Sequence, residues 1–190
     1  MARKGDFIVT YTGKHFWPLD PQPEEIDIDD IAHALSIVNR WSGHSPIPYS
    51  VAVHSLHVAE CCPEHLRLAG LLHDASEAYI ADVARPVKKL LTGYQEIEDG
   101  IQRAVAQRFD LPSGLVPLPV EVVQADLDML VTEASVFFPL ETWWRTYGGT
   151  VVSPARWDAQ DMFGDLYSPQ PFYAARGRFL SAFELYGGRR

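Results

Sequence analysis

The segment LAGLLHDASEAY, residues 68–79, joins an apolar run to three chemically active side chains. Residues 68–72 lead directly into the adjacent pair His73 and Asp74, and Glu77 follows one helical turn later. Burying an imidazole beside a carboxylate is costly unless a partner compensates. A divalent cation is such a partner, because neutral imidazole and carboxylate can both ligate it. For an isolated dipeptide, a structural His–Asp hydrogen bond at a helix end is the alternative, so the rest of the chain has to distinguish the two.

The overall composition is that of a globular domain. The chain has 190 residues, of which 47% are hydrophobic and 22% charged, so one domain with a good-sized core is expected. No apolar run approaches the length of a membrane span, and the N-terminal sequence MARKGDFIV has no apolar core of signal-peptide length. We therefore expect a cytoplasmic protein with no membrane partner. The adjacent Cys61 and Cys62 are expected to be reduced thiols buried in a helix, not metal ligands.

The charge balance restricts the class of ligand. The formal net charge is −9, and the isoelectric point predicted from the sequence is about 5.1. A nucleic-acid polymer as partner is disfavoured, because binding a phosphate backbone requires a basic surface. A small phosphorylated ligand stays compatible with this charge, since it needs only a few local cations.

Apolar side chains recur at helical spacing along most of the chain. In the first predicted helix Ile28, Ile31 and Leu35 lie on one stripe, and acidic residues occupy the N-terminal turn. Ser50 suits the N-cap of the next helix, and Pro63 suits the first turn of the third. The predicted helices run from Asp27 or Asp29 to Arg40 or Trp41, from Ser50 to Cys61, from Pro63 to Tyr79, from Asp82 to just before Gly93, from Gln95 to Phe109, from Val120 to Phe138 and from Phe172 to Tyr186.

Two segments are expected to lie outside the helices. Residues 7–11 favour β-structure, and three prolines exclude regular structure from residues 17–23, so both belong to an extended N-terminal arm. A small hairpin is expected near residues 145–153, around Gly148 and Gly149.

The predicted fold class is all-α, a bundle of about six or seven helices. No repeat, low-complexity segment or composition change divides the chain, so a single domain is expected over residues 1–190. Its parts are a core at residues 28–138, the N-terminal arm at residues 1–27 and a C-terminal extension at residues 139–190.

Two further helices carry metal-ligating side chains among apolar residues. His54 lies on the helix before the segment quoted above, and Asp126 lies in the apolar sequence VVQADLDML. Helical bundles build metal sites from such inward-facing side chains, and two imidazoles with two carboxylates suit a divalent cation. His57 shares a helical face with His54 and is expected to be a supporting or core residue, whereas Asp128 is expected to be exposed or ion-paired.

The order of these side chains resembles a known family. The pattern H…HD…D, with HDASE after an apolar helix and then D-x3-PVK, is similar to that of the HD-domain metal-dependent phosphohydrolase superfamily. Within it, the chain most resembles bacterial 5′-deoxynucleotidases and phage enzymes that hydrolyse deoxyadenosine triphosphate. The matching stretches are NRWSGHSPIPYSVAVHSLHVA, GLLHDASEAYIADVARPVK and ADLDMLVTE, within residues 28–133. The resemblance implies that the metal ligands are His54, His73, Asp74 and Asp126.

The same resemblance implies two acidic catalytic residues. Glu77 would lie beside a metal-activated water as acid, base or orienting group, and Asp82 would help to orient the nucleophile. The alternatives are a solvated helix-end residue for Glu77 and a simple helix N-cap for Asp82.

The resemblance further implies a substrate-binding wall. Lys88 of the PVK motif and Arg40 would contact phosphate, and Trp41 would pack against the sugar or base. His44 and Tyr49, in the loop between the first two predicted helices, would line the pocket. The alternatives are an exposed lysine, a helix C-cap for Arg40 and a core position for Trp41.

The function that the resemblance implies is hydrolysis of phosphate ester or anhydride bonds in deoxynucleotides, with deoxyadenosine nucleotides as the expected substrates. A triphosphate would yield deoxyadenosine and triphosphate, and a monophosphate would yield deoxynucleoside and phosphate. The expected cofactor is one divalent transition metal ion (Zn, Mn, Co, Fe or Ni), and a triphosphate substrate would bring additional Mg²⁺. The expected assembly is a homo-oligomer, located in the host cytoplasm if the chain is phage-encoded. The alternatives are an HD-type phosphodiesterase or guanosine tetraphosphate hydrolase, and a non-catalytic nucleotide-binding module stabilised by a metal.

Overall fold

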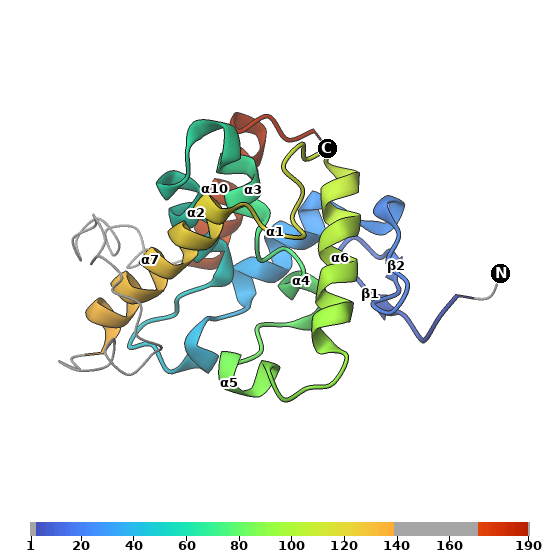
Figure 1. Ribbon diagram of the computed structural model, residues 1–190, viewed down its shortest axis with the longest axis horizontal. Helices are drawn as coiled ribbons and strands as arrows, with labels where there is room; N and C mark the ends of the chain where they lie inside the picture. Colours follow the sequence, from blue (N-terminus) through green and yellow to red (C-terminus); the bar gives the residue numbers. More distant parts are fainter. Residues whose placement is uncertain (1–2, 139–170, 190) are drawn as a thin grey trace.

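The computed structural model describes residues 3–138 and 171–189, and within them the fold is mostly helical (Figure 1). The predicted all-α bundle is therefore confirmed. The hairpin expected near residues 145–153 lies outside the described residues. None of the helices in the described part of the chain combines the length and apolar character needed to cross a membrane.

The N-terminal arm is extended, as predicted, and it is anchored to the bundle. Strands β1 (Ile8–Val9) and β2 (His15–Phe16) form an antiparallel pair, and the short 3-10 helix η1 (Pro23–Glu25) follows. The carboxylate of Asp30 accepts hydrogen bonds from the backbone N–H of Thr12 (2.6 Å) and from its hydroxyl (3.0 Å). The ring of Phe16 is fully buried and stacks on Tyr79 at 4.0 Å.

Helix α2 (Val51–Cys61) begins at its predicted cap, and helix α1 (Ile28–Ile37) begins next to Asp27, one of its two predicted starts. The Asp27 side chain accepts a hydrogen bond from the N–H of Asp29, and the Ser50 hydroxyl accepts one from the N–H of Val53. However, α1 ends at Ile37, before the predicted Arg40 or Trp41.

The early end of α1 has a tertiary cause. The backbone of Val38 to Arg40 pairs with the segment that leads into α2: the N–H of Arg40 donates to the carbonyl of Tyr49, and the N–H of Val51 donates to that of Val38, both at 2.9 Å. These bonds satisfy backbone groups that a longer helix would have used. The loop carrying Arg40 and Trp41, which includes η2 (Trp41–Gly43), is thereby held beside α2.

The predicted helix from Pro63 to Tyr79 is interrupted. The structure has η3 (Glu64–Leu66), α3 (Arg67–Leu72) and α4 (Glu77–Ile80), with a turn across residues 73–76. The next helix is also shorter than predicted. Helix α5 (Arg85–Lys88) begins after Ala84, so the prediction that Asp82 caps it is wrong.

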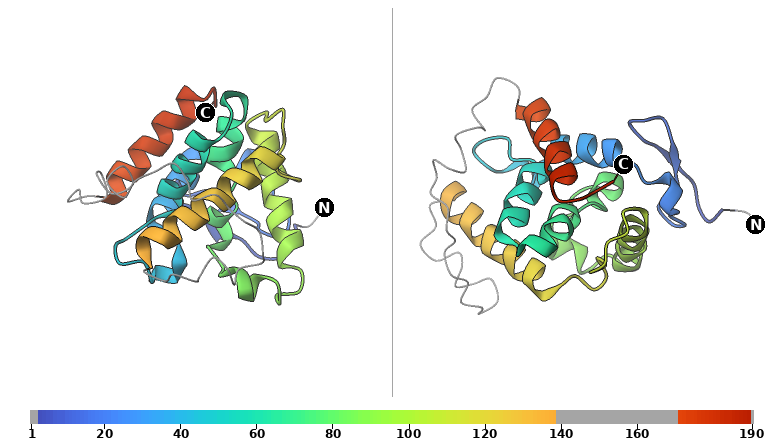
Figure 2. Two further views of the ribbon diagram at one scale, coloured as in Figure 1. Left: turned by 60° about the vertical axis from the view of Figure 1, so that its left-hand side comes forward. Right: turned by 90° about the horizontal axis from the view of Figure 1, so that it is seen from above.

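The later helices follow their predicted bounds closely. They are α6 (Tyr94–Arg108), α7 (Val120–Phe137) and α10 (Pro171–Leu185). Helix α2 contacts α1, α3, α7 and α10 (Figure 2). Its residues 51–59 are all buried. Helix α6 lies beside η1 of the arm (Figure 1). A polar side chain on α2 therefore sits at the centre of the molecule, where it needs a partner.

Candidate metal centre

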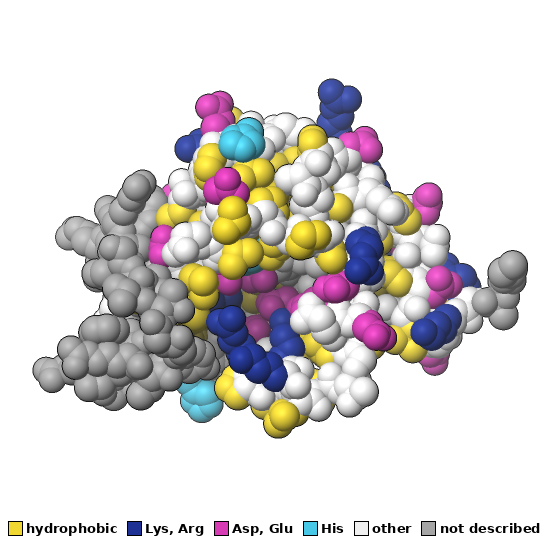
Figure 3. Space-filling view, in the orientation of Figure 1, with side chains coloured by type: hydrophobic (Ala, Val, Ile, Leu, Met, Phe, Trp, Pro, Cys, Tyr) yellow, Lys and Arg dark blue, Asp and Glu magenta, His cyan; other side chains and the backbone are white. Residues whose placement is uncertain are grey.

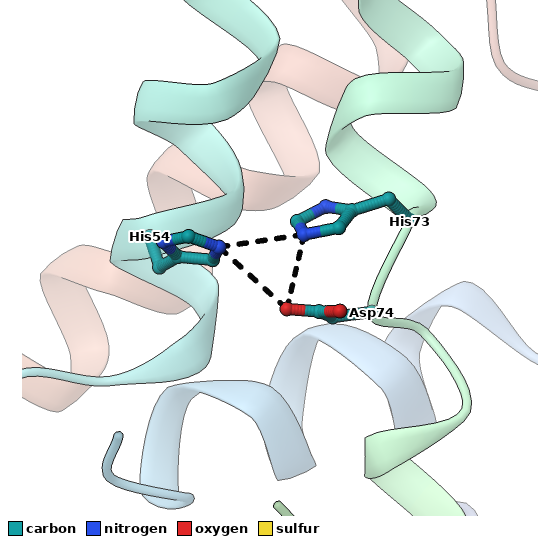
Figure 4. Close-up of side chains that lie close together, drawn as sticks. All are labelled: His54, His73 and Asp74. Carbon is teal, nitrogen blue, oxygen red and sulfur yellow. Dashed lines mark hydrogen bonds and ion pairs between the residues drawn. The ribbon is translucent and has the colours of Figure 1, made fainter. Parts of the chain in front are cut away.

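Three side chains from two parts of the bundle converge at its centre. His54 comes from α2, and His73 and Asp74 come from the turn after α3 (Figure 4). The two Nε2 atoms are 3.3 Å apart, and Asp74 Oδ2 lies 3.0 Å from His73 Nε2 and 3.6 Å from His54 Nε2. Three ligand-type atoms that close together form a cluster that could hold a metal ion.

Asp126 on α7 lies next to this cluster. Its Oδ1 is 3.1 Å from His54 Nε2 and 3.8 Å from His73 Nε2, and its side chain is 37% exposed. The four side chains expected as ligands are therefore brought together, with Asp126 on the more open side.

The other ring nitrogens explain why the Nε2 atoms face each other. Nδ1 of His54 lies 2.6 Å from a carboxylate oxygen of Glu133, and Nδ1 of His73 lies 2.8 Å from the carbonyl oxygen of Gly70. Each Nδ1 therefore carries a proton to donate, which in a neutral imidazole leaves the Nε2 lone pair free. Two lone pairs 3.3 Å apart repel unless a proton or a cation lies between them.

The observed spacing fits a metal ion. Metal bonds of about 2.0–2.2 Å at tetrahedral angles separate neighbouring ligand atoms by roughly 3.3–3.6 Å. The distances from the two Nε2 atoms of His54 and His73 to each other and to the nearest oxygens of Asp74 and Asp126 range from 3.0 to 3.8 Å. The hydrogen bonds on both Nδ1 atoms are the outer-shell contacts that metal-binding histidines usually have.

The electrostatics of the cluster favour cations. Burial and the nearby Arg40 oppose protonation of His54, but the carboxylates of Glu133 and Asp126 outweigh them and raise its pKa to about 9. Burial raises the pKa of Asp74, but His73, His54 and Arg40 outweigh it and hold that pKa well below its usual range. The cluster therefore attracts a positive charge, whether a proton or a metal ion.

Glu77 lies at the first turn of α4 and is 5% exposed. Burial raises the pKa of its carboxyl well above the usual value, and the charges of Asp74 and Asp82 raise it further. Its Oε2 atom has no hydrogen-bond partner among the described residues. The solvated alternative for Glu77 is therefore wrong: the carboxyl is buried, and its surroundings favour the protonated form.

Asp82 is held near the same cluster by an unusual backbone. Burial raises the pKa of Asp82, Arg40 opposes this shift, and Asp74 adds to it. The preceding Ala81 has φ of 62° and ψ of 164°, a conformation that residues other than glycine rarely adopt.

Arg40 and Trp41 lie beside the cluster. Arg40 Nη1 is 3.7 Å from Asp74 Oδ2, and its Nε donates to Glu133 at 3.1 Å. The indole N–H of Trp41 donates to the same Glu133 oxygen at 3.1 Å, and the ring meets Phe138 edge-on. Arg40 is thus not a simple helix cap.

Glu133 is the site residue that sequence reasoning did not single out. It is fully buried on α7, where burial raises its pKa but Arg40 and His54 outweigh that effect and lower it. It lies seven residues, or two helical turns, after Asp126, on the same face of α7. This seven-residue spacing from Asp126 is the sequence feature that could have identified Glu133 as a site residue.

Two of the remaining predicted substrate residues, Lys88 and Tyr49, have side-chain partners other than the four candidate ligands. Lys88 donates to Glu98 at 2.6 Å and lies over the ring of Tyr94. His44 is exposed, whereas Tyr49 is fully buried and its hydroxyl lies 3.0 Å from His57 Nδ1. In this structure Tyr49 supports His57 within the core and does not line an open pocket.

One face of the molecule combines both signs of charge. Acidic side chains lie in a hollow in the middle of the face seen in Figure 3, and basic side chains line its lower rim. The fold and this site define a helical protein with a buried histidine–carboxylate centre open on one side.

Comparison with known proteins places the chain in a family. It is 39% identical to the uncharacterized protein YfdR of Escherichia coli (strain K12) over 127 residues. These residues make up 67% of this chain and 70% of YfdR. It is also 42% identical to the uncharacterized protein RCAP_rcc00048 of Rhodobacter capsulatus over 120 residues. This match covers 58% of this chain and 61% of that protein. The chain therefore belongs to the YfdR family. No family model matches the chain.

Proposed function

We propose that this protein is an HD-domain phosphohydrolase that cleaves phosphate ester or anhydride bonds of deoxynucleotides, with deoxyadenosine nucleotides as the first candidates. The observation that carries the proposal is the pair of His54 and His73 Nε2 lone pairs facing each other at 3.3 Å beside Asp74 and Asp126. Two such lone pairs stay opposed only when a proton or a metal ion lies between them, and the two carboxylates beside them favour a metal ion. A bound divalent ion would supply Lewis-acid activation of water and neutralise phosphate charge.

Glu77 supports catalysis rather than binding alone. It is buried near Asp74 and Asp82, and its carboxyl holds a proton more strongly than an exposed glutamate does. Such a group can exchange a proton with a reacting water or with a leaving oxygen. A binding module has no need for an unpartnered buried carboxyl beside its ligands.

Arg40 and Lys88 supply the positive charge that a phosphate requires. The Arg40 guanidinium already lies within 3.7 Å of Asp74, and burial, which lowers its pKa, is outweighed by Glu133, Asp126 and Asp74, so Arg40 stays charged. Lys88 would reach a phosphate after leaving Glu98, since the two are now paired at 2.6 Å. Both would stabilise charge on non-bridging oxygens.

The proposal also concerns the cellular location and the assembly of the protein. We place it in the cytoplasm, where free nucleotides occur and where thiols such as those of Cys61 and Cys62 stay reduced. We also propose a homo-oligomer, which light scattering of the purified chain would test.

The test is a panel of deoxy- and ribonucleotide mono- and triphosphates, with cyclic nucleotides and guanosine tetraphosphate included, and with products identified by mass. Dialysis against a chelator should abolish hydrolysis, and a divalent transition metal should restore it. Glu77→Gln should lower kcat at least about 100-fold, because it removes the proton-exchanging group.

The controls separate the alternatives. Asp128→Asn should retain wild-type activity, because the Asp128 side chain accepts a hydrogen bond from Gln124 on the same helix, α7. Cleavage of only a cyclic nucleotide or of guanosine tetraphosphate would replace the proposed substrate. Tight deoxynucleotide binding without any product over hours, or full activity of Asp74→Ala, would show that the chain is not this enzyme.

A further inference from the structure

One carboxylate joins the candidate metal centre to the wall expected to bind substrate. Glu133 Oε1 lies 2.6 Å from His54 Nδ1. Glu133 Oε2 accepts hydrogen bonds from Arg40 Nε and from the indole N–H of Trp41, both at 3.1 Å. Glu133 is fully buried, so no water competes for these bonds.

The loop that Glu133 holds has an unfavourable backbone. Trp41 has φ of 59° and Ser42 has φ of 49°, and Gly43 follows at 76°. Side chains other than glycine are disfavoured in this left-handed region, and a bulky residue there is a genuine outlier. Such a conformation persists only where neighbouring contacts hold it. For Trp41, these contacts include its hydrogen bond to Glu133.

The two oxygens of Glu133 act on different parts of the site. Through Oε1, Glu133 holds the proton of His54 on Nδ1, so that Nε2 presents its lone pair toward His73. Through Oε2, Glu133 fixes the guanidinium of Arg40 and the indole of Trp41 relative to the same imidazole.

We infer that Glu133 is a positioning residue that couples the orientation of the metal ligand His54 to that of the substrate wall formed by Arg40 and Trp41. The part of this inference that concerns the substrate wall rests on the proposed function. The part that concerns metal binding does not, because it can be measured with a metal ion alone.

The first experiment measures metal affinity without substrate. Mn²⁺ is titrated into metal-free wild-type protein and into Glu133→Gln, and free Mn²⁺ is followed by electron paramagnetic resonance. Glu133→Gln should weaken Mn²⁺ binding about 10- to 100-fold, the usual effect of losing an outer-shell partner of a ligating histidine. The matched control is Glu121→Gln, an exposed glutamate on the same helix, which should bind Mn²⁺ like the wild type.

The second experiment uses nitrogen-15 NMR of the Zn²⁺-loaded protein, which reports structure and not activity. His54 should show the Nδ1–H tautomer in the wild type, assigned by its loss in His54→Gln. The indole N–H signal of Trp41, assigned among the five tryptophans with Trp41→Phe, should shift in Glu133→Gln and not in Glu121→Gln.

The outcomes decide the inference. Wild-type Mn²⁺ affinity and an unmoved Trp41 indole signal in folded Glu133→Gln would overturn it. If Glu133→Gln does not fold, the wild-type spectrum alone still tests the inference. An Nε2–H tautomer of His54 in that spectrum would overturn the inference. If these results hold but no deoxynucleotide is hydrolysed, the proposed function fails while the coupling stands. If hydrolysis is found, Glu133→Gln should raise KM as well as lower metal affinity.

Discussion

At the scale of single residues, the site contains two buried glutamates with opposite electrostatics. Glu133 faces Arg40 and His54, which outweigh burial and lower its pKa. Glu77 is buried near Asp74 and Asp82, so burial and like charge both raise its pKa. The same type of side chain therefore favours its charged form in one position and its protonated form in the other, because the surroundings differ.

His57 provides a pH-dependent test at this scale. Burial lowers its pKa to about 4, with His54 and Arg178 acting in the same direction and Glu133 against it. The unfolded chain binds a proton near pH 6.5, whereas the native His57 stays neutral. Its contribution to stability is therefore complete above pH 6.5 and is lost as the pH falls toward 4, by on the order of 3 kcal/mol.

His57→Gln keeps a polar partner for Tyr49 but cannot titrate. We expect the free energy of unfolding of metal-free protein to fall less steeply between pH 7 and pH 4.5 in this variant than in the wild type. Urea unfolding at both pH values measures the difference. Parallel pH profiles would show that His57 is not held neutral.

At the scale of elements, the close approach of α2 and α3 places His54 and His73 opposite each other. Gly70 on α3 makes this possible. A Cβ at that position would lie 2.8 Å from Cys62 Sγ and 3.1 Å from the Cα of Ala59. The Ala59 contact is with backbone, which cannot move without shifting α2.

Gly70→Ala should therefore destabilise the protein by roughly 1–3 kcal/mol, since overpacking outweighs the gain in helix propensity. The matched control is Gly177→Ala on α10, where an added Cβ meets nothing within 4 Å. Gly177→Ala should raise the free energy of unfolding by up to about 1 kcal/mol. Thermal unfolding of the two variants measures both effects, and a Gly70→Ala protein as stable as the wild type would contradict the packing argument.

At the scale of the whole molecule, the candidate ligands come from α2, α7 and the turn after α3, so a bound ion would connect parts of the bundle that are distant in sequence. An ion that binds the folded state alone stabilises it by about 2.7 kcal/mol at 100 times its Kd.

We therefore expect saturating Mn²⁺ or Zn²⁺ to raise the Tm by roughly 5–10 °C. Asp126→Ala should lose much of this increase because it removes a carboxylate 3.1 Å from His54 Nε2. Asp128→Ala on the same helix should keep it. Scanning calorimetry with and without metal gives both values, and an unchanged wild-type Tm would argue against a metal centre that spans the bundle.

Much of the fold and the members of the candidate cluster could be predicted from local pattern. The caps Asp27 and Ser50 and the bounds of α6, α7 and α10 depend on nearby residues, so they are readable along the chain. The types of side chain at His54, His73, Asp74 and Asp126 already indicated a cation site, because their chemistry does not depend on their placement.

Contacts between distant residues decided the rest. Helix α1 stops at Ile37 because residues 38–40 pair with the segment before α2, and the predicted third helix breaks at the turn that carries His73 and Asp74. Glu133 lies 79 residues from His54 along the chain, and only the packing of α7 on α2 brings them within 2.6 Å. Periodicity shows which face of a helix is buried, but it does not show which side chain of another helix that face will meet.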